Sequence, residues 1–490
     1  MTQIAAFHIV APSTVEVNEE FAIGIKALTE PYFVGTRAFV AVPQVEGPYN
    51  LSPRGITYMD NVPKQWNGTV RISSEGGYRG PDGLSFKSRP GPYANDHRPI
   101  TRLPGLRFSQ AGIKRVEVVD PVSGARGLSN PIEVSAEPLQ ERLYWGDLHS
   151  QTYFSDGLRC PEELYAFARH EAWLDIFGLA DHSEWITDRQ WDYFVAVTND
   201  CDEPGRFVTL VGQEWTNHKY GHRNLHFPGG SGPCVRSNHP VDGELERLYE
   251  IARAEGALLI PHHSANVTMG VNWDLGHDPE VERLVEMCSV WGISERSAED
   301  GNHRPIRATG GERAGQHVQD ALRLGRRYGF VGGGDTHDGR PGDELHSLQH
   351  QPEEYCKLWR QGIMGVWAKK LTRESVFEAL WNRRVYATTN VRTILRFSVC
   401  GQPMGGQATW QGARPLTLQV AGQSPISRID IVRNGDDILT LQPDECEASF
   451  EGEDAGGTGR DWYYARITHA DGEMAWSSPV WVSPAEQYAD

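Results

Sequence analysis

Short apolar runs alternate with longer amphipathic segments through the middle of the chain. The apolar runs begin at Tyr144, Leu174, Phe207, Ala257 and Phe330, and each has the length of a buried β-strand. Helical patterns fall between several of them. Alternation of strands and helices favours an α/β fold with parallel strands. We therefore predict a central α/β domain over residues 141–392.

Four of the intervening segments carry helix signals. Pro161 stands at a helix start and is followed by two acidic residues, which suits the first turn. Apolar residues at positions 245, 248, 251 and 252 form a helical stripe. Thr372 has the side chain of a good N-cap, and a further helical pattern begins at Val318.

The two flanks have the period of β-strands instead. Residues 1–140 contain strand-like runs at 5–9, 14–17, 21–25, 39–42, 70–72, 114–119 and 132–134. We predict a β-rich N-terminal domain with a long loop insertion over 44–105, or else further strands that this Gly- and Pro-rich stretch conceals. Residues 393–490 predict a second β-sandwich, with a hairpin turn at Asn434-Gly435.

Each central strand-like run is followed by polar side chains with metal-binding chemistry. His149 and Gln151 are two apart and can face one object, and Asp156 can return to it after a turn. The C-terminal ends of parallel barrel strands lie on one face, so we expect all these residues to converge. The remaining ones are Asp181 and His182, Glu214, His222 and His226, His262 and His263, and Asp335 and His337.

Composition narrows the range of partners. The 490 residues carry a formal net charge of −18, with 65 acidic and 47 basic side chains, which argues against nucleic acid or an anionic membrane as a partner. Seven scattered cysteines without a CxxC pair favour a reducing compartment, and we predict a cytoplasmic protein. We see neither a signal peptide nor a transmembrane run.

The ordered set of motifs resembles the PHP (polymerase and histidinol phosphatase) superfamily, and most closely a bacterial branch with a domain of unknown function. The motifs are Gly-Asp-Leu-His-Ser-Gln-Thr, Ala-Asp-His-Ser-Glu-Trp, Gly-Gln-Glu-Trp-Thr, Gly-His-Arg-Asn, Pro-His-His and Gly-Asp-Thr-His-Asp, all within residues 141–390. The resemblance implies a distorted (β/α)7 TIM-like barrel, flanked here by the two β-sandwich-like domains. It also implies up to three metal ions at the strand ends.

The resemblance assigns the metal ligands in three groups. Two or three divalent ions (Mn, Zn or Fe) would be held by His149, Gln151, Glu214 and Asp335; by Glu214, His222 and His262; and by Asp156, His182 and His337. His226 is the alternative to His222. Gln151 stands where many members carry histidine, and its amide oxygen favours manganese or iron over zinc.

This arrangement implies hydrolysis of a small-molecule phosphate ester, with a phosphodiester preferred. Two metals about 3.5–4 Å apart clamp a phosphoryl group and activate a water as hydroxide. Glu214, Asp335 and His337 are the predicted catalytic residues. Asp147, Asp181 and Glu286 are predicted to orient ligand imidazoles. Four residues are predicted to contact the phosphate: Lys219, Arg223, His263 and Arg340.

Two other functions fit the same residues. The first is a metal-dependent hydrolase of carboxylic esters, sulfate esters or lactones. The second is a non-enzymatic binding protein in which the β-domains bind and the central domain is a scaffold. Trp185, Trp215 and Trp273 flank the motifs and could wall a pocket for an apolar ester group.

Overall fold

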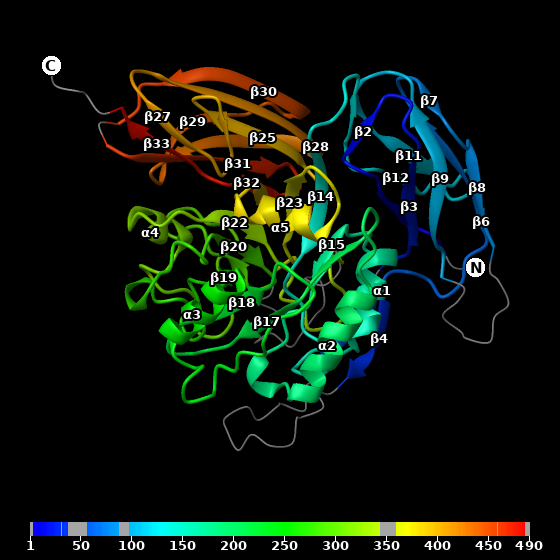
Figure 1. Cartoon of the computed structure of the whole chain (residues 1–490). Helices are drawn as coiled ribbons and strands as arrows, with labels where there is room; N and C mark the ends of the chain where they lie inside the picture. The colour runs from blue at the N-terminus through cyan, green and yellow to red at the C-terminus, as the bar shows by residue number, and fades with distance from the viewer. Residues whose placement is uncertain are drawn as a thin grey trace.

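The computed structural model describes residues 3–30, 32–37, 56–87, 98–343, 359–457 and 459–485. Figure 1 shows an N-terminal β-sandwich in blue and cyan, a central part in green and yellow, and a C-terminal β-sandwich in orange and red. No helix in these ranges is both long and apolar enough to cross a membrane.

The N-terminal part consists of two sheets around a core of its own. One sheet has the order β7-β9-β3-β1-β12-β11-β6-β8 and the other β10-β13-β2. The strands are β1 (Ala6–Val10), β2 (Thr14–Glu16), β3 (Phe21–Leu28), β4 (Tyr32–Arg37), β5 (Ile56–Asp60), β6 (Gly68–Ser74), β7 (Tyr78–Arg79), β8 (Gly83–Phe86), β9 (Ile100–Phe108), β10 (Gly112–Lys114), β11 (Val116–Val119), β12 (Arg126–Leu128) and β13 (Ile132–Ser135).

The long loop predicted over 44–105 is wrong where the structure describes it, because β5 to β8 and the start of β9 lie there. The strand predicted at 70–72 is confirmed, because β6 contains it and buries the alternate positions Val70 and Ile72. β5, β7 and β8 were not predicted. The strand predicted at 39–42 lies outside the described residues.

The central part contains short strands and the five α-helices of the described chain. Its strands are β14 (Arg142–Asp147), β15 (Ile176–Gly178), β16 (Val208–Leu210), β17 (Gly212–Trp215), β18 (Arg223–His226), β19 (Leu258–Pro261), β20 (Leu284–Ser289), β21 (Gly292–Ile293), β22 (Gly329–Gly332), β23 (Ile363–Ala368) and β24 (Val385–Thr388). The helices are α1 (Pro161–His170), α2 (Asp188–Asp200), α3 (Leu245–Glu255), α4 (Val318–Arg323) and α5 (Arg373–Trp381), with 3₁₀ turns at Ser183–Trp185 and Trp273–Leu275.

The predicted (β/α)7 barrel is wrong. β14, β15 and β16 pair in parallel, but β23 and β24 join the same sheet antiparallel. β17, β18 and β19 form a separate antiparallel sheet, and β20 to β22 form a third. Parallel neighbours need a long crossover, usually a helix, whereas antiparallel neighbours do not. The short segment 216–222 joins β17 to β18 directly, so the helix-after-every-strand pattern fails there.

All four predicted helices form. α1 begins at Pro161 with Glu162 and Glu163 in its first turn, and the Thr372 side chain accepts a hydrogen bond from the Ser375 amide at the start of α5. α2, capped by Thr187, was not predicted.

The C-terminal part is a β-sandwich whose main sheet continues from the central part. Thr388 of β24 pairs with Ala475 of β32, so one 14-stranded sheet runs through both in the described chain. The predicted hairpin turn is confirmed, with Asn434 and Gly435 both at positive φ. The strands are β25 (Ile394–Val399), β26 (Gln402–Pro403), β27 (Gln407–Trp410), β28 (Arg414–Arg433), β29 (Asp436–Leu441), β30 (Glu445–Asp454), β31 (Asp461–His469), β32 (Met474–Ser477) and β33 (Val480–Pro484).

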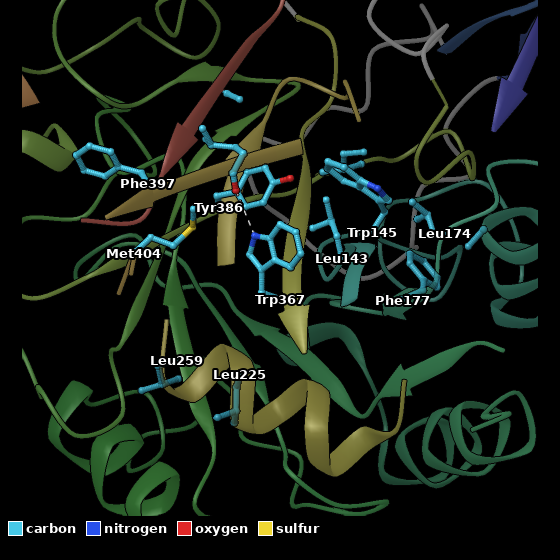
Figure 2. Close-up of a cluster of buried hydrophobic side chains, with 14 of the residues drawn as sticks. Leu143, Trp145, Leu174, Phe177, Leu225, Leu259, Trp367, Tyr386, Phe397 and Met404 are labelled. Atoms are coloured by element: carbon cyan, nitrogen blue, oxygen red, sulfur yellow. Dashed lines mark hydrogen bonds between the residues drawn. The ribbon is translucent and has the colours of Figure 1, made fainter. Parts of the chain in front are cut away.

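One apolar core spans this junction. Figure 2 shows Trp145 and Trp367 of the central part in the same cluster as Phe397 of the C-terminal part. The rings of Trp145 and Tyr386 meet edge to face at 5.9 Å, and the Trp367 indole donates to the Leu395 carbonyl at 3.2 Å. Burial of apolar side chains is the main favourable term in folding. The shared core therefore holds the central and C-terminal parts together.

Candidate metal centre

The ends of five short strands bring the predicted ligands together. His149 follows β14, His182 follows β15, Glu214 is in β17, His262 follows β19, and Asp335 follows β22. β18 contributes through its opposite end. Because it runs antiparallel between β17 and β19, the residue before it, His222, lies at the same edge as their C-terminal ends.

Glu214 lies at the centre of the cluster and is 1% exposed. Its Oε1 is 2.9 Å from His222 Nδ1 and 3.4 Å from His182 Nδ1. Its Oε2 is 3.5 Å from His149 Nε2. His262 Nε2 is 3.7 Å from Oε1. One buried carboxylate therefore faces four imidazoles, a geometry suited to bridging two cations.

Three groups of side chains have ligand atoms within 4.8 Å of one another in the described chain: Asp156, His182 and His337; His222, His262 and His263; and His149, Glu214 and His262. The first is one of the predicted groups. The second differs from prediction because His263, expected to bind substrate, lies with the ligand histidines. His226 does not face Glu214, since its Nε2 meets the Leu148 carbonyl at 2.9 Å.

Three imidazoles are held in the orientation that metal binding requires. His149 Nδ1 lies 2.8 Å from Glu286 Oε2, and His337 Nδ1 lies 3.0 Å from the Asp335 carbonyl. Both partners accept only, so Nδ1 carries the proton and Nε2 is left to bind a cation. His182 Nδ1 donates to the Thr216 hydroxyl, which in turn donates to Glu214 Oε1 at 2.9 Å.

Seven of the buried polar atoms that have no hydrogen-bond partner in the described part of the chain belong to the ligand set. They are His149 Nε2, Gln151 Oε1, Asp156 Oδ1, His222 Nε2, His262 Nδ1 and Nε2, and His263 Nδ1. Native proteins rarely leave such atoms unsatisfied. Imidazole nitrogens and carboxylate oxygens are ligands for Zn²⁺, Mn²⁺ and Fe²⁺. The donor set therefore fits the predicted divalent metals.

Gln151 differs from its predicted role. Its Nε2 donates to Glu214 Oε2 at 3.0 Å and to Asp335 Oδ1 at 3.3 Å, while Oε1 has no hydrogen-bond partner among the described residues. An amide nitrogen that carries two protons cannot ligate a cation, so oxygen ligation requires the carboxamide to turn over. Asp335 itself lies at φ 50°, with its amide donating to the His149 carbonyl at 2.7 Å.

The pKa values of the histidines divide the cluster into two halves, one with raised and one with lowered values. Burial disfavours protonation of His337, but Asp156 outweighs burial and raises the pKa of His337 to about 9. Glu214 and Asp156 likewise raise the pKa of the buried His182. Burial and neighbouring histidines lower the pKa of both His262 and His263. The latter two are therefore neutral and ready to ligate at neutral pH.

Of the three carboxylates predicted to orient imidazoles, Glu286 does so and two do not. Asp147 Oδ1 accepts from the backbone amides of His149 and Gly334, at 2.9 and 2.8 Å. Asp181 Oδ1 accepts from Thr152 and Ser155 in the loop that leads to Asp156. Both carboxylates hold ligand-bearing loops rather than rings. Burial raises the pKa of Asp147 to about 7 and that of Asp181 to about 6.

Three of the predicted phosphate-binding residues lie beside carboxylates instead. Arg223 is fully buried on the face of β18 opposite His222 and donates to Glu282 Oε1 at 2.6 Å. Lys219 is exposed and lies 3.4 Å from Glu244. Arg340 is buried with Nη1 3.4 Å from Asp343.

Of the three tryptophans predicted to wall a pocket, Trp185 lies beside a ligand, with its ring 5.1 Å from His182. Trp215 and Trp273 are buried with their indoles bonded to backbone carbonyls. The role of Trp185 in a pocket stays a prediction. Sequence reasoning missed Thr216, although the strand period that pairs His149 with Gln151 also places Thr216 on the face of Glu214. It also missed the His218 ring, 5.3 Å from His222.

Comparison with known proteins gives a family match but no activity. Residues 166–277 and 326–409 match the model of a family described as "Protein of unknown function (DUF3604)". These ranges contain His182, Glu214, His222, His262, Asp335 and His337, whereas the first motif, with His149, precedes them.

Relatives include an uncharacterized protein of Chlamydia trachomatis, 28% identical over 409 residues, and one of Chlamydia pneumoniae, 29% identical over 403 residues. Each match covers 78% of this chain, and the chain spans 63% of the length of each relative.

Among solved structures, a β-glucuronidase of Bacteroides uniformis aligns over 98% of this chain and 61% of its own, at 7% identity and a TM-score of 0.18. At that score the likeness indicates neither fold nor function.

Proposed function

We propose that the chain is a metal-dependent hydrolase of small phosphate esters. The observation that carries the proposal is the buried Glu214 carboxylate among four imidazoles, with Asp335 and Asp156 beside them. The resemblance of the motifs to the PHP superfamily supports phosphate esters as the substrate class. Bound divalent ions would supply a water of lowered pKa and a clamp for phosphoryl oxygens.

The side chains that would hold the ions are those of the three groups, with Glu214 shared between the first two predicted positions. Glu286 fixes the His149 ring, and Thr216 fixes both His182 and Glu214. Hydrogen bonds of this kind hold the ligand side chains in place, so that they need not reorganise when the reaction occurs.

Substrate would approach from the side of Asp156 and His337. These side chains are 23% and 18% exposed, whereas those of His149, Glu214 and His262 are at most 1% exposed. If only two ions bind, and the group of Asp156, His182 and His337 holds neither, His337 keeps its proton at neutral pH because Asp156 outweighs burial and raises its pKa to about 9. It would then donate that proton to the departing alkoxide.

The positions of the basic side chains favour a phosphodiester substrate over a phosphomonoester. Arg223 is committed to Glu282, and Lys219 lies at the surface beside Glu244. Neither supplies the second positive charge that a dianionic monoester would call for.

The test is turnover of bis(p-nitrophenyl) phosphate and p-nitrophenyl phosphate by protein loaded with Mn²⁺, Zn²⁺ or Fe²⁺, alongside metal analysis. We expect at least two ions per chain and faster turnover of the diester. Glu214→Gln should lower activity by more than about 100-fold, beyond the range of an outer partner, and reduce the metal content. Lys219→Ala is the matched control and should change neither.

Two results would contradict the proposal. Less than one ion per chain would favour a binding protein, and a fully loaded protein that cleaves neither compound would exclude phosphoester hydrolysis. Turnover of p-nitrophenyl acetate, p-nitrophenyl sulfate or a lactone in that case would identify the alternative hydrolase.

We also propose a cytoplasmic location. The support is chemical: six cysteines in the described ranges are free thiols.

A further inference from the structure

A cavity lies at the junction of the N-terminal sandwich and the central part, away from the metal centre. Its volume is about 450 Å³, and its walls come from β3, β9, the end of α1 and the segments before β15 and β16. Asp175 and Arg206 precede those strands, whereas Asp181 and Glu214 follow or end strands of the same region. The cavity is therefore at the strand ends opposite the ligands.

The walls carry an unusual charge for this acidic protein. Five arginines and two carboxylates line the cavity: Arg98, Arg102, Arg169, Arg206 and Arg392, with Glu171 and Asp175. Arg98 forms a double hydrogen bond with Glu171, at 2.9 and 3.0 Å. Arg169 and Arg206 share one further carboxylate, that of Glu203.

Two of these arginines depend on a single acidic partner, because Arg169 and Arg206 both pair with the Glu203 carboxylate. Arg392 donates to the backbone carbonyls of Ala172 and Trp173. Within the described ranges no hydrogen bond or ion pair is found for Arg102, which is exposed on β9.

These charges converge on one spot. Burial and the charges of Arg169, Arg206 and Arg102 together lower the pKa of His170 at the end of α1. Burial lowers the pKa of Arg169, and Arg206 and Arg102 lower it further. Cations from three separate segments that repel one another across a cavity are stabilised when an anion lies between them.

At the cavity, the N-terminal sandwich and the central part are in close contact. Trp173 lies at φ 50°, and its ring packs on Gly24 of β3, where any Cβ would come within 2.2 Å of it. Gly24 pairs with Arg102, so this contact fixes Arg102 against the central part. The backbone position of Arg102 at the cavity is thus set by the fold.

We propose that this cavity binds a small organic or inorganic anion with two or more negative charges, carried on phosphate or carboxylate groups. The volume matches small-molecule sites, which run from about 300 to 1,000 Å³. Guanidinium groups present paired donors that match both kinds of anion. The proposal is independent of the hydrolase function, because no ligand of the metal centre lines the cavity.

The test is calorimetric titration of the full chain with pyrophosphate, inorganic phosphate and citrate. We expect one site per chain, with affinity that falls as salt is added. Replacing Arg102 and Arg206 together by alanine should weaken binding by about tenfold or more, since bonds to charged groups are lost. The single variant Arg102→Gln removes no bond found in the described ranges, so it should fold and still weaken binding.

Two controls locate the site. Arg126→Ala removes an exposed arginine of the same N-terminal sheet outside the cavity and should leave binding unchanged. Glu214→Ala should also leave it unchanged. Binding that is lost with Glu214→Ala but kept in the arginine variants would place the anions at the metal centre and overturn the proposal. Absence of binding at millimolar concentration of all three probes would overturn it too.

Discussion

At the scale of single residues, hydrogen bonds to the ring nitrogens decide what the metal centre can bind. His149 is the clearest case, because Glu286 holds its Nδ1 proton and so turns Nε2 towards Glu214 and Asp335. Such outer partners fix the tautomer of a ligand and raise its basicity. Glu286 is therefore a positioning residue whose effect should appear in metal affinity.

We predict that Glu286→Ala lowers metal affinity by about 10–100-fold, the usual cost of losing an outer partner. The measurement is competition for Zn²⁺ or Mn²⁺ with a fluorescent chelator. Asp181→Asn is the comparison, because the Asp181 carboxylate bonds to Thr152 and Ser155 and not to an imidazole in the hydrogen bonds described. Equal affinity of Glu286→Ala and the unaltered chain would show that the ring is held by packing alone.

At the scale of elements, the sequence predicted strand ends well and strand direction poorly. α1 spans the predicted positions because Pro161 and two acidic residues define its start. The apolar runs before His149, His182, His262 and Asp335 all form strands. Each is short and almost wholly buried, so its composition does not show which way it runs.

β18 shows the limit most clearly. All four of its residues, Arg223 to His226, are buried, so no polar–apolar alternation marks which face meets the metal centre. For this reason the sequence left His226 open as the alternative to His222, and it wrongly placed Arg223 on the side of the metal centre. Arg223 is buried because Glu282 neutralises it, and a pairing between residues this far apart in sequence has no local pattern.

The Arg223–Glu282 pair itself joins four elements. Glu282 accepts from Arg223 at 2.6 Å, from Tyr249 of α3 at 3.0 Å and from Tyr328 before β22 at 2.9 Å. Burial raises the pKa of Glu282, but Arg223 outweighs it and lowers the pKa to about 2. A carboxyl with a depressed pKa stabilises the fold above its unfolded value and loses this contribution as pH falls towards the folded value.

We therefore predict that Glu282→Gln destabilises the chain at pH 7 by about 3–5 kcal/mol, because it leaves a buried guanidinium unpaired. The difference in unfolding free energy between the two proteins should shrink as pH falls from about 4.5 towards 2. Urea unfolding across that range measures it. A constant difference would mean that Glu282 has an ordinary pKa in the folded chain.

At the scale of the whole molecule, the sheets divide the chain differently from the sequence pattern. The change of periodicity near residue 393 suggests a domain boundary, yet β24 and β32 pair across it and one apolar core contains Trp145, Trp367 and Phe397. The N-terminal sandwich has a separate core. It meets the rest through side chains such as the Trp145 indole, which donates to Ser13 at 2.9 Å.

These two junctions should respond differently to truncation. A chain ending at residue 392 loses β25 to β33 and uncovers the Trp367 and Tyr386 faces of the shared core, so we expect it to aggregate or remain unfolded. A chain beginning at residue 136 keeps that core, and should fold with a lower melting temperature and an unchanged metal content. It would also lose Arg98 and Arg102, and with them the anion cavity. Circular dichroism, thermal unfolding and metal analysis compare the two. A soluble, cooperatively folded chain ending at 392 would show that the continuous sheet is a contact between independent domains, and that periodicity had placed the boundary correctly.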